Sequence, residues 1–146
     1  MTHGDEEHVV DRAGWPPGPW DNEPDKVQWT DAATGLPCLI VRNDTGGLCG
    51  YVGVAEEHPY FGVDKNDLDL GVHGGLTYSG LCQGHICHVP APGASDRVWW
   101  LGFDCAHWSD TVPGMIQYGM RGTYRDLKYV KDECHDLAAQ LKDVHS

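Results

Sequence analysis

Residues suited to chemistry are concentrated between positions 73 and 110. The run Asp104-Cys105-Ala106-His107-Trp108-Ser109-Asp110 begins where an apolar segment ends, and active residues often stand at such strand-to-loop junctions. If this run turns helically, Asp104 and His107 share one face and Asp110 lies one step round. That arrangement would suit two metal ligands with a general base, or a histidine oriented by an aspartate for acid–base catalysis. The structural alternative is that Asp104 caps a short helix through its carboxylate.

His73 is a further candidate, within His73-Gly74-Gly75. Apolar and polar or glycine positions alternate over residues 68–78, a period of two that is typical of a strand with one face in the core. His73 then points away from the apolar face, and the glycines beside it allow a ligand or a backbone to come close. The alternative is an exposed histidine in a strand weakened by glycine. The predicted catalytic set is His73, Asp104, His107 and Asp110.

Four potential metal ligands fall within seven residues in the run Cys82-Gln83-Gly84-His85-Ile86-Cys87-His88. Thiolate and imidazole are the groups that zinc prefers, and three or four of them must converge on the ion. No second cluster lies at a standard zinc-finger distance, so a loop of apolar-packed cysteines and solvated histidines is the alternative. The predicted ligands of zinc, or of another divalent transition metal, are Cys82, His85, Cys87, His88 and His107.

The chain has six cysteines, an even number that raises the question of disulfides. Disulfides persist in oxidising compartments, which a protein reaches by export. The N-terminal residues are acidic and contain no apolar run, unlike a secretory signal. We therefore expect a cytoplasmic protein with reduced cysteines.

Short strands are expected to position these residues. Turn-rich sequence separates apolar runs that predict strands at 27–30, 37–42, 49–54, 68–78 and 98–103. Residues 1–25 are predicted to form an extended acidic arm, because three prolines between Trp15 and Trp20 exclude helix and central strand. The remaining residues, 26–146, are expected to form a single domain.

The C-terminal segment predicts a long amphipathic helix. Apolar residues recur there at spacings of three and four, in one stripe made of Leu127, Val130, Cys134, Leu137, Leu141 and Val144. Thr123 and Asp126 resemble a capping box at its start. Most such stripes pack on their own sheet, although the period also suits the seam of a homodimer. The predicted fold class is α+β, a mostly antiparallel sheet of short strands with this helix packed on one face.

Ten basic and 22 acidic side chains give the chain a net charge of −12. Such a surface repels nucleic acid and anionic membranes, whose binding depends on neutralising phosphate. No segment approaches the roughly 20 apolar residues of a membrane span. We expect a small-molecule substrate or a host protein as the partner, with Arg42, Arg121 and Arg125 as candidates for an anion contact.

Four motifs cover much of the chain: Gly18-Pro19-Trp20, Cys49-Gly50-Tyr51-Val52-Gly53-Val54, His73-Gly74-Gly75-Leu76-Thr77 and Gly102-Phe103-Asp104-Cys105-Ala106-His107. Together they resemble a group of small uncharacterised proteins encoded in tailed bacteriophages and in bacterial genomes. The resemblance implies a phage-related setting inside a bacterial host cell. It carries no activity with it.

The leading hypothesis is a phage-type, metal-dependent hydrolase of unknown substrate. A metal-bound water would be the nucleophile, its pKa lowered from near 16 toward about 7, with one carboxylate as the base. The first alternative is a non-catalytic acidic inhibitor of a host defence protein, which small size and acidity favour. The second is a zinc-stabilised structural module without an open coordination position.

The metal hypothesis predicts about one equivalent of zinc or a similar ion per chain, in protein purified without chelator or affinity-tag histidines. Elemental analysis should show that the metal is lost in Cys82→Ser and in His107→Ala. A fully folded protein that contains no metal would contradict this hypothesis.

Overall fold

The computed structural model describes residues 6–7, 15–43, 46–73, 75–83, 86–87, 97–105, 110–111, 113 and 123–144. Within these ranges the chain forms a six-stranded sheet, a two-stranded sheet, two 3-10 helices and one α-helix. In chain order the elements are β1 (Glu6–Glu7), η1 (Pro19–Asn22), β2 (Lys26–Thr30), β3 (Pro37–Arg42), β4 (Leu48–Val54), η2 (Lys65–Asp67), β5 (Tyr78–Gly80), β6 (Trp99–Asp104), β7 (Asp110–Thr111), β8 (Thr123–Tyr124) and α1 (Leu127–Lys142).

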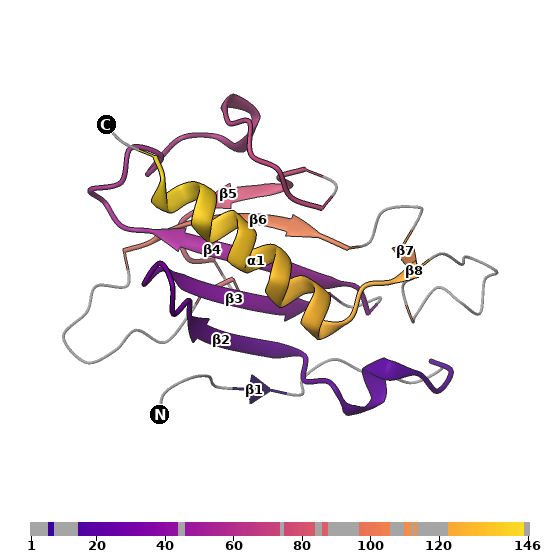
Figure 1. The fold of residues 1–146 in the computed structure, drawn as a ribbon. Helices are drawn as coiled ribbons and strands as arrows, with labels where there is room; N and C mark the ends of the chain where they lie inside the picture. The colour runs from indigo at the N-terminus through magenta and orange to yellow at the C-terminus, as the bar shows by residue number, and fades with distance from the viewer. Residues whose placement is uncertain are drawn as a thin grey trace.

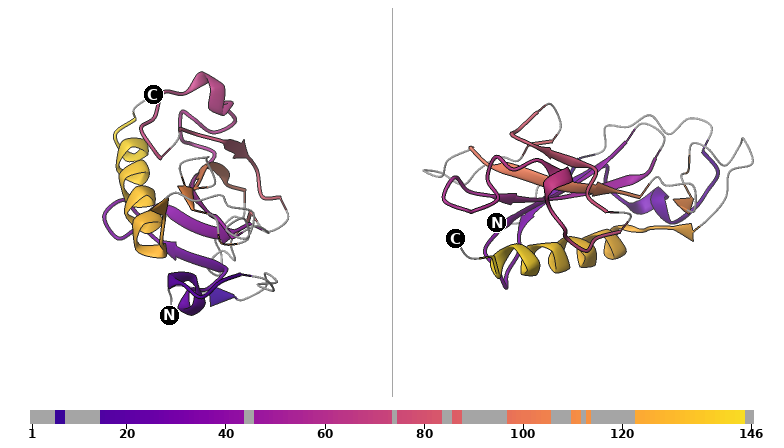
Figure 2. Two further views of the ribbon diagram at one scale, coloured as in Figure 1. Left: turned by 90° about the vertical axis from the view of Figure 1, so that its right-hand side faces the viewer. Right: turned by 90° about the horizontal axis from the view of Figure 1, so that it is seen from above.

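The large sheet has the order β1-β2-β3-β4-β6-β5, and each neighbouring pair in it is antiparallel (Figure 1). Helix α1 lies across one face of this sheet, over β3 and β4 (Figure 2). The fold class is therefore α+β, as predicted. The predicted strands at 27–30, 37–42, 49–54 and 98–103 are confirmed to within one residue at each end.

Helix α1 is held on the sheet by the predicted apolar stripe, of which Val130, Cys134, Leu137 and Leu141 are fully buried. Its close approach to β4 requires Gly50, where an added Cβ would lie 2.8 Å from the Cys134 sulfur. The stripe thus packs on the chain's own sheet. The capping prediction was partly wrong: Asp126 is the N-cap, its carboxylate accepting from the backbone N–H of Tyr129, whereas Thr123 belongs to β8.

The segment predicted as a strand over 68–78 becomes one only at its end, in β5. Its apolar positions do pack against the core beneath α1: Leu68, Leu70, Val72 and Leu76. The side chain of Gln140 pairs with Gly71, accepting from its N–H at 2.9 Å and donating to its carbonyl at 2.8 Å. A helix side chain thus occupies the place of a strand partner. Alternating burial therefore arises here without a sheet, and the strand prediction was wrong.

The face of the sheet opposite α1 carries a second, smaller apolar cluster. Its buried members are Leu39, Tyr51, Val98 and Trp100. Alternate residues of β3, β4 and β6 point to opposite faces, so the same strands supply both clusters. Within the described residues, no helix is long and apolar enough to cross a membrane.

Arg42, at the end of β3, is buried and saturated with hydrogen bonds. A guanidinium has five N–H donors, and all five meet acceptors from three separate parts of the chain: Asp25 Oδ1, Glu23 Oε1, Pro24 O, Gly46 O and the Tyr124 hydroxyl. The side chains of Arg42 and Asp25 are both completely shielded from solvent, with Nε and Oδ1 2.9 Å apart. A buried charge is tolerated only with such partners. Arg42 is therefore a structural anchor, not an open anion-binding group.

Glu23 extends this anchor to the start of α1. Its Oε2 accepts from the backbone N–H of Leu127 at 2.7 Å, and its Oε1 accepts from the Tyr124 hydroxyl. Trp20, which precedes it in the acidic arm, is 5% exposed and packs edge-on against Tyr124. Residues 20–25 of the arm are thus integral to the domain, and Arg42 is the group that joins them to it.

We predict that Arg42→Met lowers the free energy of unfolding by about 3–5 kcal/mol, because it leaves the Asp25 charge buried without its partner. Urea denaturation measures this. The matched control is Arg97→Met, since Arg97 pairs with Glu56 where both side chains are 53% exposed; it should cost no more than about 1 kcal/mol. Similar losses in the two variants would contradict the role given to Arg42.

Candidate functional site

His73 is the centre of a polar cluster beside α1. Its Nε2 lies 3.0 Å from each carboxylate oxygen of Asp110, and its Nδ1 lies 2.8 Å from the Tyr129 hydroxyl. An ionised carboxylate can only accept, so we assign the ring proton to Nε2, which donates to Asp110. In the neutral ring Nδ1 then accepts from the Tyr129 hydroxyl. Asp110, His73 and Tyr129 thus form a continuous hydrogen-bonded chain.

Asp110 receives a second donor, which is charged, from Arg125. Nε of Arg125 lies 3.0 Å from Oδ1 of Asp110, whose side chain is completely buried while that of Arg125 is 26% exposed. A buried carboxylate requires donors to compensate for its lost hydration. His73 and Arg125 supply them, one from the segment that precedes β5 and the other from the start of α1.

Arg125 is held in a fixed orientation at the edge of this cluster. Its guanidinium carbon lies 4.9 Å from the centre of the Tyr129 ring, a distance at which a cation is attracted to an aromatic face. Among the described residues, its terminal nitrogens Nη1 and Nη2 have no hydrogen-bond partner. A planar guanidinium with its outer N–H groups available suits a carboxylate or phosphate group.

The helix contributes to the cluster through a spacing of four residues. Tyr129 and Glu133 lie four residues apart on one side of α1, and Arg125 stands just before the N-cap, Asp126. Oε1 of Glu133 accepts from the backbone N–H of His73 at 2.8 Å, and the rings of His73 and Tyr129 meet edge-on. Neither Tyr129 nor Glu133 is among the site residues predicted from the sequence. The polar i, i+4, i+8 pattern beside the apolar stripe is the signal that could have found them.

Tyr129 remains a phenol over the neutral range. Burial raises the pKa of its hydroxyl, the negative charge of Glu133 raises it further, and Arg125 opposes the rise. The hydroxyl is therefore available as a proton donor to His73, rather than as a phenolate nucleophile.

Asp104 does not join this cluster. It is the last residue of β6 and pairs in register with Cys49, which packs on the face opposite α1. Its neighbour Phe103 belongs to the core beneath α1, and successive strand residues point to opposite faces. The structure thus brings together His73 and Asp110 from the predicted set. In the described part of the chain no helix begins at Asp104, and Asp110 itself begins β7.

Three of the predicted ligands, His85, His88 and His107, lie outside the described residues. Cys82 and Cys87 are joined by a disulfide, so the expectation of reduced cysteines does not hold for this pair. A sulfur in a disulfide is not a thiolate ligand. Within the described residues, no group of three or more His, Cys, Asp and Glu side chains is arranged to hold a metal ion.

Neither a family model, nor a curated protein, nor a solved structure matches this chain. Membership of the phage-encoded group stays a prediction from the motifs. Function has to be inferred from the chemistry of the site, because a fold by itself does not specify it. The cluster of His73, Asp110, Tyr129 and Arg125 is the described site with the strongest chemical content.

We predict different costs for the two aspartates when each is changed to asparagine. Asp110→Asn removes a buried charge that holds His73 and Arg125, and should lower the free energy of unfolding by about 1–3 kcal/mol. Asp104→Asn, on a partly exposed residue at a strand end, should stay within about 1 kcal/mol. Urea denaturation of both variants checks this, and a larger cost for Asp104→Asn would contradict the placement of the site.

Proposed function

We propose that this chain is a hydrolase-like enzyme with an acid–base centre at His73 and Asp110, acting on a small molecule that carries an anionic group. The observation that supports the proposal best is the hydrogen-bonded chain from Asp110 through His73 to Tyr129. A histidine held between a buried carboxylate and a hydroxyl is an arrangement that can accept a proton and return it.

Each residue of the cluster has a role in this proposal. The Tyr129 hydroxyl exchanges a proton with the substrate or with the attacking water, and Nδ1 of His73 takes up the proton that Tyr129 passes on. Asp110 fixes the ring through Nε2 and offsets the positive charge of the imidazolium. Arg125 binds the anionic group of the substrate beside Tyr129, because its guanidinium lies over that ring.

The metal-dependent form of this hydrolase remains part of the proposal. His73 and Asp110 supply an imidazole and a carboxylate side by side, which are groups that zinc accepts. A complete ligand set would need a further group from outside the described residues, for which His107 is the candidate. Cys82 and Cys87 lie on the opposite face of the sheet, so after reduction of their disulfide they could bind only a separate metal ion. Metal content is therefore best compared in oxidised and reduced protein.

A second candidate, an acidic inhibitor of a host defence protein, is favoured by the net charge of −12. In that case the partner would be a basic protein surface, and the phage resemblance would place the encounter in the bacterial cytoplasm.

A homodimer through α1 would have to use the outer side of the helix, where Lys128, Asp132 and His135 are exposed. Exposed charges at the edge of a protein–protein interface change the association rate and its salt dependence more than they change the affinity.

The enzyme proposal predicts that Tyr129→Phe lowers kcat/KM by about 10²- to 10⁴-fold, the usual contribution of general acid–base catalysis. The probes are p-nitrophenyl acetate and p-nitrophenyl phosphate, with nitrophenolate release followed in a spectrophotometer. The substitution keeps the ring beneath Arg125 and removes only the hydroxyl. His73→Gln should cause a loss of similar size.

Tyr60→Phe is the matched control, since Tyr60 packs on His58 away from the cluster, and it should keep wild-type turnover. Equal activity of Tyr129→Phe and wild type would contradict the proposal. So would the absence of turnover of both esters by the folded wild-type protein, which would favour the inhibitor.

A further inference from the structure

The disulfide Cys82–Cys87 closes a very short loop on the sheet face opposite α1. The two residues are five positions apart, and between them Gln83 and Ile86 pair through two backbone hydrogen bonds of 3.0 Å. Closing so short a loop restricts the unfolded chain less than closing a long one. Both cysteines are partly exposed. These features are poorly suited to a purely stabilising crosslink and suit one that is opened and closed in the folded protein.

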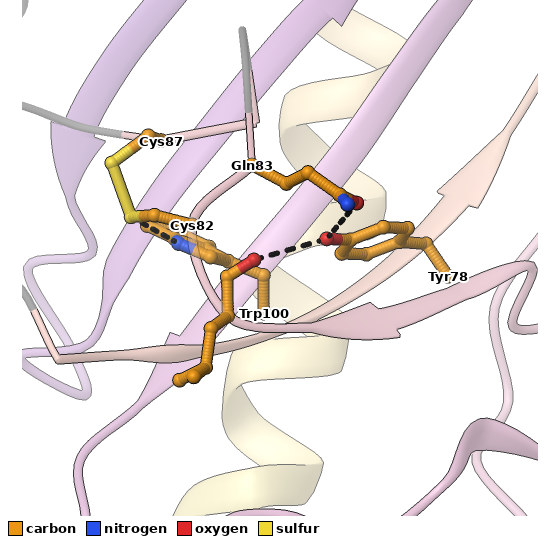
Figure 3. The surroundings of a disulfide bond; sticks show 6 residues. Tyr78, Cys82, Gln83, Cys87 and Trp100 are labelled. Atoms are coloured by element: carbon orange, nitrogen blue, oxygen red, sulfur yellow. Dashed lines mark hydrogen bonds between the residues drawn. A yellow bond between two sulfur atoms is a disulfide. The ribbon is translucent and has the colours of Figure 1, made fainter.

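The sulfur of Cys82 has a fixed hydrogen-bond donor. The indole Nε1 of Trp100 donates to the sulfur of Cys82 at 3.4 Å (Figure 3), and Cys82 packs against the buried cluster that contains Trp100. Tyr78 holds the start of the loop, its hydroxyl donating to the carbonyl of Leu81 at 3.0 Å. A donor fixed on one sulfur stabilises negative charge on that sulfur as the S–S bond breaks.

The four other cysteines differ from this pair in their reactivity. Cys38, Cys49, Cys105 and Cys134 remain thiols. Burial raises the pKa of each of them, to about 12 for Cys38 and Cys49. Thiols of this kind are inert at neutral pH because the thiolate is the reactive form. Exchange chemistry in the described part of the chain is therefore confined to the pair in the short loop.

We infer that Cys82–Cys87 is a reversible thiol–disulfide exchange site, which a protein or small-molecule dithiol reduces by attack on Cys87 while Cys82 leaves toward the Trp100 indole. In the first step a thiolate of the dithiol bonds to the Cys87 sulfur as the Cys82–Cys87 bond breaks, and Cys82 leaves as a thiolate. In the second step the other thiol of the dithiol attacks its partner sulfur in the mixed disulfide and releases Cys87. Two electrons and two protons pass from the dithiol, which becomes a disulfide, to the two cysteines.

This site is separate from the His73 cluster, which lies against α1 on the other side of the sheet. Its chemistry needs neither Tyr129 nor Arg125. The inference therefore does not rest on the proposed hydrolase function, and either can fail without the other.

The experiment treats oxidised protein with dithiothreitol, labels thiols with a maleimide and identifies labelled peptides by mass spectrometry. Cys82 and Cys87 should become labelled while Cys38, Cys49, Cys105 and Cys134 do not, and the helical circular dichroism signal should persist. In a parallel sample that is left unlabelled, removal of the reductant and addition of oxidised glutathione should restore the disulfide. Reduction that occurs only in denaturant, or that unfolds the chain, would overturn the exchange site.

Trp100→Phe tests the direction of attack. Loss of the donor should slow reduction by roughly three- to tenfold, since hydrogen bonds to charged groups are among the stronger ones. Trp99→Phe is the matched control, because the Trp99 indole donates to Val63 and not to the disulfide; it should leave the rate unchanged. An unchanged rate in Trp100→Phe would overturn the assignment of Cys82 as the leaving group.

Variants that lack one cysteine of the pair test the assignment of the leaving group without altering the buried tryptophan. Cys82 in Cys87→Ser should react with iodoacetamide at lower pH than Cys87 does in Cys82→Ser, because the Trp100 indole donates to the Cys82 sulfur. The opposite order of reactivity would overturn the assignment.

Discussion

The buried guanidinium of Arg42 is the constraint on which the arrangement of the domain depends. A cation removed from water must have every N–H matched to an acceptor, and a single strand cannot supply five of them. The acceptors come from the acidic arm, from the turn after β3 and from Tyr124 just before α1. Three segments distant in the sequence are thereby required to meet at the end of β3. The apolar stripe holds α1 on the sheet, but this polar junction fixes where the helix begins.

A second buried charge, Asp110 in β7, follows the same rule beside the start of the helix. Its carboxylate draws Arg125 from the helix start and His73 from the segment alongside the helix. The stretch between Tyr124 and Tyr129 is consequently held by two charged junctions of opposite sign, Arg42 on one side and Asp110 on the other. Groups held in this way lose little entropy when a ligand binds, which is the preorganisation that a catalytic or binding site requires.

The two faces of the sheet carry different kinds of side chain. Beneath α1 the strands bury mainly aliphatic residues, and the buried polar side chains in the described part of the chain include Asp110 of the His73 cluster, Arg42 and Asp31. On the opposite face an aromatic cluster around Trp100 supports the loop of Cys82 and Cys87. Because alternate residues of one strand serve opposite faces, β6 supplies Phe103 to the first and Trp100 to the second. The acid–base cluster and the disulfide thus lie on opposite faces of one sheet and share no side chain.

Continuous apolar runs in the sequence determined β3, β4 and β6, because these strands are buried on both faces. The apolar period of 3.6 determined α1, because the helix buries one side. Residue types also marked His73 and Asp110 as chemically significant. Their contact, made across 37 positions, was decided only by the tertiary structure. Asp104 stands much nearer to Asp110 in sequence, yet strand alternation turns it to the other face. Which polar groups meet depends on how distant segments pack, and neither spacing nor composition encodes that packing locally.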